Sequence, residues 1–513
     1  MIFSSYAFLF VFLPITFCGF ALLTYFKNEY VLVAWLVGAS LLFYGYWNPP
    51  YLLLLLLSTG CNYAFGKAIH RATQKRKMWM VIAVGLNLAL LGYFKYANFF
   101  VANLNAVLHA DVHLQHIFLP LGISFFTFQQ IAYIVDVYQR KAEQTSLMHY
   151  CLFVSFFPQL IAGPIVHHKE MLPQFTRQNI CSIQSKNIAI GLTILLMGFC
   201  KKTVIADSLA PFANSVFLAA KSGTALTFYQ AWGGALTYTM QLYFDFSGYI
   251  DMAIGMALLF GIHLPLNFNS PYKALNIPDF WRRWHMTLSR FIRDYLYIPL
   301  GGNRGNLLKR SSTLIITMTL SGLWHGAGWT FIFWGLLHGF YMVVHHCWHA
   351  LRREVVEYHS GIHMAVSVFS RWFLTFLAIT IGWVFFRSEN FASAWSLLST
   401  MFSTETLSPL PYIHEFGLWW AKDIAGIRVP EWIYGMFWLG MSSAIAFTAP
   451  NTQQIMQNVL GPFYEKEHLK TWSLFSVKWR PTLWFALLGA VITVMSIVFL
   501  TLYQEREFLY FQF

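Results

Sequence analysis

Charged residues are scarce in this sequence. Only 11% of its 513 residues are Asp, Glu, Lys or Arg, whereas a soluble globular chain usually carries about 25%. Hydrophobic residues make up 57% of the chain, and the mean hydropathy is +0.52. A water-soluble fold of this length could not bury so much apolar surface in one core, so the lipid bilayer must act as part of its solvent.

Motifs for nucleotide-driven and hydrolase chemistry are absent from the sequence. It has no Walker loop, no G-x-G-x-x-G and no G-x-S-x-G, so ATP-driven transport and serine hydrolysis have no motif support. The six cysteines are scattered without C-x-x-C spacing, which predicts reduced, buried thiols. The histidines at 167–168 and 345–349 are only a weak signal for a metal, and we expect no metal site.

The net charge of +13 would suggest a nucleic-acid partner in a soluble protein. In a membrane protein, Lys and Arg instead gather in the cytoplasmic loops, and we expect no nucleic acid to bind. The basic loop 67–77 predicts a cytoplasmic face, while 99–116 contains no Lys or Arg. With basic residues also preceding the last apolar run, the pattern predicts that both termini lie outside the cytoplasm.

Long apolar runs predict a helical protein. A membrane span needs about 20 apolar residues. The clear candidates are 4–26, 31–48, 51–67, 79–98, 117–138, 187–206, 226–245, 330–348, 366–386, 433–449 and 482–502. The runs 148–165, 247–262 and 312–324 are shorter or interrupted, and could be half-length or re-entrant helices packed inside protein. We therefore expect an all-α polytopic membrane protein of about 11–14 helices.

These helices are expected to form one membrane domain over residues 1–513, because nothing in the sequence resembles a soluble domain or a flexible linker. The motifs that could carry chemistry fall within its core, 117–348.

One histidine is flanked by three glycines, in the run 321–329. Only about a dozen apolar residues precede it, and they reach roughly 20 Å, less than a ~30 Å hydrocarbon core. This indicates a hairpin that enters the membrane and returns, with His325 near its tip and Trp324 and Trp329 shaping the passage. A neutral, desolvated histidine can serve as a general base. The alternative is a histidine that only satisfies a hydrogen bond between helices.

Residues 276–295 suggest an amphipathic helix at the cytoplasmic interface. It could serve only as a membrane anchor, or it could attract an anionic donor such as a coenzyme A thioester. His285 could be a second active-site histidine or a structural one. Aromatic and aliphatic residues share one face, and basic residues surround it: Trp281, Trp284 and Leu288, with Arg282, Arg283, Arg290 and Arg293.

Asp245 and Asp251 lie in an apolar context, where carboxylates are costly unless they are paired or hydrogen-bonded. They could orient a histidine, or tie helices together through Arg282 or Arg283. We favour the structural role. Lys201-Lys202 is expected to mark a membrane boundary.

Three sequence runs in combination resemble the membrane-bound O-acyltransferase family. They are Asp279-Phe-Trp-Arg-Arg-Trp-His285-Met-Thr-Leu-Ser289, then 297–302, then Leu323-Trp-His325-Gly326. The opening Phe3-Ser4-Ser5 and 244–249 are similar to the bacterial branch of that family, most of all to the alginate O-acetyltransferase type.

The resemblance implies that His325 is catalytic and that His285 is a second characteristic histidine. It also implies a ring of helices around a central funnel, in the bacterial inner membrane with periplasmic termini. No cofactor would be tightly bound; acetyl-CoA or another acetyl thioester would be the donor. The acceptor would be a cell-surface or exported polysaccharide, alginate-like, reached through a periplasmic acetyltransferase partner.

Two readings without enzymatic activity are possible from the sequence. The chain could be an exporter of a polysaccharide precursor, although its sparse intramembrane charge argues against a continuous polar pathway. It could also be a scaffold of a polymer-synthesis complex.

Overall fold

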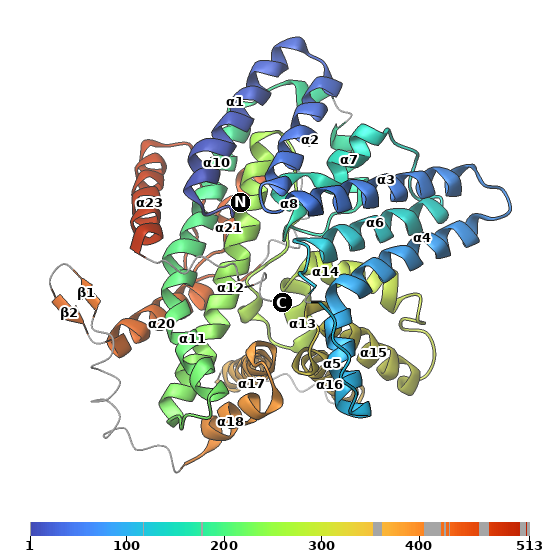
Figure 1. Ribbon diagram of the computed structural model, residues 1–513. Helices are drawn as coiled ribbons and strands as arrows, with labels where there is room; N and C mark the ends of the chain where they lie inside the picture. Colours follow the sequence, from blue (N-terminus) through green and yellow to red (C-terminus); the bar gives the residue numbers. More distant parts are fainter. Residues whose placement is uncertain are drawn as a thin grey trace. The chain divides into compact units, whose positions relative to one another are not determined.

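The computed structural model describes residues 2–115, 117–175, 178–351, 362–404, 422–424, 427–429, 431–460, 471–502 and 509. These residues are almost entirely helical, and the predicted all-α polytopic membrane fold is confirmed (Figure 1). Beside the helices there is one antiparallel hairpin, formed by β1 (Lys422–Ile424) and β2 (Ile427–Val429).

Within the described ranges, seven helical stretches are long and apolar enough to cross a bilayer. One is Phe8–Phe26, which contains α1 (Leu13–Leu23). The others are formed by α3 (Pro49–Arg71), α4 and α5 (Arg76–Leu91, Ala97–Leu108), α10 and α11 (Ser185–Cys200, Asp207–Lys221), α12 (Phe228–Leu259), α17 (Ile362–Arg387) and α23 (Leu483–Leu502).

Shorter helices fill the rest of the described chain, as the interrupted apolar runs predict. The run 148–165 breaks into α7 (Leu147–Ser155) and α8 (Phe157–Leu160), where Pro158 starts a new turn. Other shorter helices are α2 (Glu29–Gly45), α6 (Ile123–Tyr138), α9 (His168–Phe175), α18 (Phe391–Phe402), α20 (Glu431–Thr448), α21 (Thr452–Ile455) and α22 (Gln457–Leu460).

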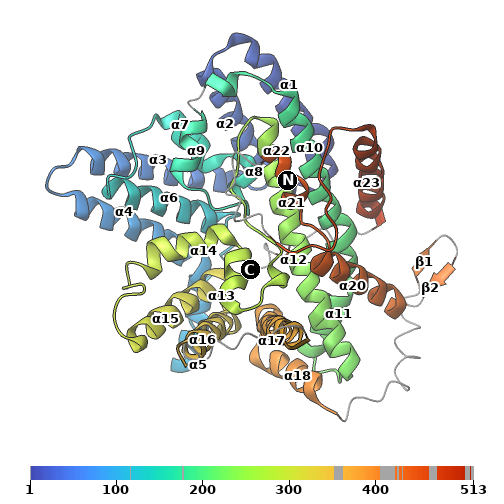
Figure 2. The ribbon, with the colours of Figure 1, turned by 180° about the vertical axis from the view of Figure 1, so that it is seen from behind.

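The chain forms two compact units. Unit 1 comprises Met1–Phe199, Gly248–Leu266 and Pro481–Ile492; unit 2 comprises Cys200–Ser247, Asn267–Arg480 and Thr493–Phe513. In unit 1, α3, α4 and α6 lie side by side (Figures 1 and 2). Asn62 on α3 and Asn87 on α4 exchange amide hydrogen bonds of 3.2 and 2.6 Å, which satisfies two buried polar side chains within the protein.

Helix α12 is one continuous helix of 32 residues. The prediction of a span at 226–245 followed by a separate short helix at 247–262 is therefore wrong. Ser247-Gly248 looks like an interruption in the sequence, but the helix is buried along its whole apolar window. Gly255 allows close packing, since a Cβ there would lie 2.5 Å from the backbone nitrogen of Leu195 on α10.

Helices α15 (Leu307–His325) and α16 (Trp329–Leu351) form the hairpin that the sequence predicts, within unit 2 (Figure 2). Helix α15 is longer than predicted, because the side chain of Asn306 accepts a 3.0 Å hydrogen bond from Lys309 N and starts the helix before Ser312. Its 19 residues extend about 28 Å.

Glycines bring the two helices of this hairpin together. A Cβ at Gly335 would collide with the carbonyl oxygen of Met318, and a Cβ at Gly322 would lie 3.0 Å from the Cα of Gly335. A Cβ at Gly339 would lie 2.9 Å from the Cα of Ile315. Small residues at such interfaces are the usual means of close helix packing in membranes.

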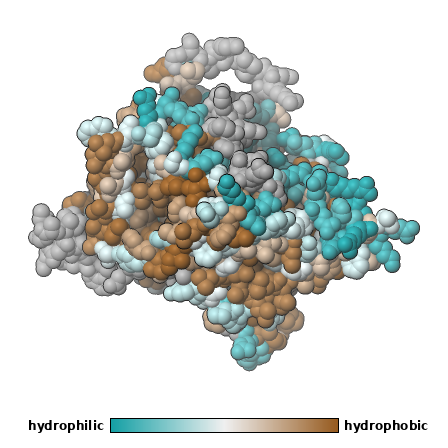
Figure 3. Space-filling view, turned by 90° about the horizontal axis from the view of Figure 1, so that it is seen from above, coloured by the Kyte–Doolittle hydropathy of each residue, from teal (hydrophilic) through white to brown (hydrophobic). Residues whose placement is uncertain are grey.

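Large apolar side chains are exposed along several helices. On α23, Leu483 is 75% and Trp484 81% exposed, and Figure 3 shows apolar side chains (brown) over much of the face in view. Soluble monomers rarely expose large contiguous apolar patches, so this surface suits contact with lipid.

We predict that Gly335→Val loosens the hairpin of α15 and α16. The new side chain has no room against the backbone of Met318, and overpacking of this kind typically costs about 1–3 kcal/mol. The midpoint of thermal unfolding in detergent should fall. Gly440→Val is the matched control, because no described atom lies within 4 Å of a Cβ at Gly440; equal shifts for both variants would contradict the packing argument.

Candidate active site

His325 is the last residue of α15, and Gly326 follows it in an extended conformation that ends the helix. The side chain is 4% exposed. Its ring lies against three aromatic rings, with centroid distances of 4.8 Å to Trp324, 5.1 Å to Trp334 and 5.4 Å to Phe386. Any substrate of His325 must therefore enter a space lined by aromatic side chains.

The expected amphipathic helix over 276–295 is interrupted. It consists of α13 (Ile277–Arg283) and α14 (Met286–Ile292), followed by a π-helical turn, Arg293–Tyr297. The break falls at His285, which has a left-handed backbone (φ 44°, ψ 52°). Such a conformation is uncommon for a residue with a side chain, and strained residues of this kind cluster at functional sites.

Hydrogen bonds hold the break at His285 in place. Trp284 N donates to Phe280 O at 2.8 Å and closes α13, while Met286 N donates to Asn267 O at 3.0 Å. The side chain of Asn276 accepts a 2.8 Å hydrogen bond from Asp279 N and starts α13. The local sequence thus builds two short helices with one histidine between them.

The structure brings the two predicted histidines together. The ring centroids of His285 and His325 are 6.4 Å apart, and Trp324 lies beside both, at 6.3 and 4.8 Å. His285 is fully buried, and Phe246 packs edge-on against it at 4.9 Å. Two imidazoles thus lie within one cluster of aromatic rings in unit 2.

The side chain of Asn267 determines which ring nitrogen of His285 carries hydrogen. Oδ1 of Asn267 accepts hydrogen bonds from Thr287 N at 3.1 Å and from Thr287 Oγ1 at 2.9 Å. A backbone N–H can only donate, so this atom is the amide oxygen. Because Nδ1 of His285 lies 3.1 Å from the same oxygen, Nδ1 carries the hydrogen and Nε2 is the acceptor nitrogen.

Burial lowers the pKa of His285 to about 3. The ring is therefore neutral at pH 7, as a hydrogen-bonding group or a proton acceptor requires. With Nδ1–H bound to Asn267, the basic nitrogen is Nε2.

The two tryptophans that the sequence places near His325 differ in exposure. Trp324 is 5% exposed, whereas Trp329, the first residue of α16, is 56% exposed. Sequence reasoning did not identify Trp334 and Phe386, which also wall the His325 ring. They are aromatic residues of the long apolar runs 330–348 and 366–386, and no local motif distinguished them.

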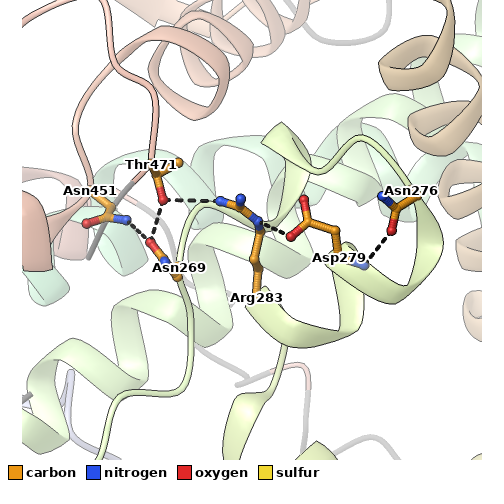
Figure 4. A network of polar contacts seen from close by, with 6 residues as sticks. All are labelled: Asn269, Asn276, Asp279, Arg283, Asn451 and Thr471. Atoms are coloured by element: carbon orange, nitrogen blue, oxygen red, sulfur yellow. Dashed lines mark hydrogen bonds and ion pairs between the residues drawn. The ribbon is translucent and has the colours of Figure 1, made fainter. Parts of the chain in front are cut away.

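Arg283 belongs to a polar network shown in Figure 4. Its Nε donates to Asp279 Oδ1 at 2.9 Å, and its Nη1 donates to Thr471 Oγ1 at 3.1 Å. Thr471 in turn donates to Asn269 Oδ1 at 2.9 Å, as does Asn451 Nδ2. In this structure Arg283 therefore ties α13 to residues 451 and 471.

The other arginines of this segment are more accessible. Arg282 and Arg293 are exposed, and Arg290 is half-buried. Arg293 Nε contacts Asp294 Oδ1 at 2.7 Å. Arg282 is thus the better placed of the two adjacent predicted donor-binding arginines to meet an anionic ligand.

Asp245 forms part of a buried ion cluster. Lys202 Nζ lies 2.8 Å from Asp245 Oδ1 and 2.7 Å from Asp207 Oδ1, and the backbone nitrogen of Leu509 donates to Asp245 Oδ2 at 3.0 Å. All three charged side chains are less than 10% exposed. Lys202 therefore serves as the cation of a buried cluster, a role that its place in the sequence did not predict. The favoured alternative for Asp245, joining helices, agrees with this arrangement, although its partner is Lys202.

Asp251 is buried on the part of α12 that belongs to unit 1. A Cβ at Gly198 would lie 2.9 Å from the Cβ of Asp251, so α10 and α12 pack closely there. In unit 1, His168 Nδ1 lies 3.3 Å from Asp136 Oδ2, and both side chains are buried.

Comparisons with known proteins agree on one family. The family model described as MBOAT, membrane-bound O-acyltransferase family, matches residues 117–386. The chain is 47% identical over 430 residues to the peptidoglycan O-acetyltransferase of Helicobacter pylori, covering 78% of this chain and 80% of that protein. It is 44% identical over 416 residues to the probable alginate O-acetylase AlgI of Pseudomonas aeruginosa, covering 79% and 76%. It is also similar to the teichoic acid D-alanyltransferase of Bacillus subtilis, 29% identical over 233 residues, covering 43% and 58%.

We predict that Lys202→Met strongly destabilises the protein. The variant removes the cation that two buried carboxylates contact, and breaking a buried ion pair in this way costs about 3–5 kcal/mol. The yield of folded protein in the membrane and its thermal unfolding in detergent measure the effect.

Lys221→Met is the matched control for this prediction. Lys221 contacts Glu389 at 2.7 Å, but the two side chains are 49% and 61% exposed, and such surface pairs contribute about 0–1 kcal/mol. If both variants unfolded at the wild-type temperature, the buried ion cluster would not contribute to the stability of the fold.

Proposed function

Because the chain belongs to the membrane-bound O-acyltransferase family and is therefore an acyltransferase, we propose that it transfers an acetyl group from a cytoplasmic thioester across the membrane for O-acetylation of a cell-surface or exported polysaccharide. The observation that carries the proposal is the pair of buried histidines, His285 and His325, with ring centroids 6.4 Å apart. An exporter or a scaffold would not require this pair.

In the proposed reaction, the neutral ring of His325 removes the proton from an acceptor hydroxyl. The hydroxyl oxygen attacks the thioester carbonyl, the new C–O bond forms and the C–S bond breaks. The thiolate leaves and takes the proton back from the imidazolium. General base catalysis of this kind typically contributes a factor of about 10²–10⁴.

His285 has a supporting role in this mechanism. Its Nδ1–H donates to Asn267 Oδ1, which holds the neutral ring in one orientation beside His325. The aromatic walls around His325 limit access of water, which would otherwise hydrolyse the thioester.

The donor is proposed to be acetyl-CoA or another acetyl thioester, bound without a resident cofactor. An exposed guanidinium such as Arg282 suits the phosphate groups of such a donor, since Arg binds phosphate through paired hydrogen bonds. Arg283 keeps α13 in place through Asp279 and Thr471, and it would support the donor site indirectly.

The acceptor is proposed to be a hydroxyl of an alginate-like polysaccharide. The relatives' names include peptidoglycan and alginate, so the shared feature is a sugar hydroxyl outside the cytoplasm. We further propose that the protein resides in the bacterial inner membrane with both termini in the periplasm, and that a periplasmic acetyltransferase partner receives or delivers the acetyl group.

We predict that His325→Ala abolishes acetylation while the amount of protein in the membrane stays at the wild-type level. The acetyl content of the surface polymer, measured by mass analysis in a deletion strain that carries the variant, gives the answer. His70→Ala is the control, because His70 is an exposed histidine at the end of α3 and its loss should leave acetylation unchanged. Wild-type acetylation with His325→Ala would remove His325 from the mechanism.

We predict that Arg282→Glu raises the KM for acetyl-CoA about tenfold with little change in kcat. The variant replaces a contact to a donor phosphate by repulsion, and this weakens binding equally in the ground state and the transition state. Initial rates in membrane vesicles at several acetyl-CoA concentrations test this. Arg304→Glu makes the same charge change at another exposed position. A KM that responds equally to both variants would point to general surface charge and not to a site at Arg282.

A further inference from the structure

Another buried histidine, His338, lies one aromatic ring away from His325. It follows Trp334 by one turn on α16, with their ring centroids 4.9 Å apart, and Trp334 packs against His325 at 5.1 Å. His338 is 0% exposed. The rings of Trp281 and Trp383 also surround it, at 5.4 and 6.3 Å. The ring of Trp334 therefore packs against both histidines.

The polar atoms of this cluster have no partner among the residues that the structure describes. Neither Nδ1 nor Nε2 of His338 takes part in a hydrogen bond there, and the same holds for Nε1 of Trp334 and of Trp281. Buried polar groups in proteins nearly always have a hydrogen-bond partner. A neutral imidazole offers one donor and one acceptor, and each indole offers a donor. The cluster thus fits a ligand that can both donate and accept.

Gly382 on α17 packs closely against two of these nitrogens. A Cβ at Gly382 would lie 2.8 Å from Nε2 of His338 and 3.5 Å from Nε1 of Trp334. The two nitrogens therefore lie beside the same backbone position, and any larger residue at 382 would press against them. Because the surroundings are aromatic, a neutral polar group suits this region better than a charged one.

We propose that His338 and Trp334 bind an amide group in the arm of the acyl donor while its thioester lies at His325. The indole N–H of Trp334 would donate to the amide oxygen, and the amide N–H would donate to the unprotonated ring nitrogen of His338. In a coenzyme A thioester the first amide follows the sulfur by two carbon atoms, and the aromatic rings suit its methylene groups. The inference rests on the proposed function, since it assigns part of the donor site.

The test compares two donors, acetyl-CoA and an analogue in which the amide nearest the sulfur is replaced by two methylene groups. For the wild-type protein in detergent, kcat/KM should be about tenfold lower with the analogue, the effect of roughly one hydrogen bond. For His338→Phe, the two donors should give nearly equal kcat/KM, because the variant no longer recognises the amide. The analogue should react at the same rate with both proteins.

Gly382→Ala tests the site without changing either nitrogen-bearing side chain. Its methyl group occupies the region beside His338 and Trp334, so the preference for acetyl-CoA should again fall. Gly440→Ala is the matched control, since no described atom lies within 4 Å of a Cβ there. This variant should keep the wild-type preference.

Two results would overturn the inference while leaving the acyltransferase intact. One is a tenfold preference for acetyl-CoA that persists in both His338→Phe and Gly382→Ala. The other is a lower thermal stability of both variants with an unchanged preference, which would mean that an internal water molecule occupies the site. Absence of any acetyl transfer from acetyl-CoA by the wild-type protein would overturn the proposed donor together with this site.

Discussion

The hydrocarbon layer offers no hydrogen-bond partner, so the polar groups of a membrane protein must be satisfied by the protein itself. Several buried arrangements in this chain obey that constraint. Asn62 and Asn87 pair their amides, Lys202 contacts two carboxylates, and the amide oxygen of Asn267 faces three donors. The polar groups of each arrangement meet in only one register of the segments that carry them. Each arrangement therefore determines how the apolar side chains around it pack.

The candidate active site combines this constraint with close packing. Asn267 orients His285 through a hydrogen bond to Nδ1. Gly322 and Gly335 bring α15 and α16 together, and His325 at the end of α15 lies beside His285. Such a site can keep an imidazole neutral and ready to accept a proton, which is the state that transfer of an acyl group to a hydroxyl demands.

The long apolar runs were enough to predict α3, α17 and α23, and the motif around His325 was enough to predict the hairpin and its histidine. The break at His285 could not be predicted, because the amphipathic pattern continues across it and the bend depends on Asn267, which lies 18 residues earlier. The burial of Lys202 was missed for a related reason: its partner Asp245 is distant in sequence. Local patterns indicate which residues are polar, but only the fold shows which polar residues meet.

Helix α12 differs from the other long helices in its surroundings. Its 32 residues extend about 48 Å, well beyond a ~30 Å hydrocarbon layer, yet every residue of its apolar window is buried, whereas only 11% of the window of α23 is. A helix shielded from lipid does not have to match the thickness of the bilayer. Changes in acyl-chain length or sterol content would act on lipid-exposed helices such as α23 and much less on α12.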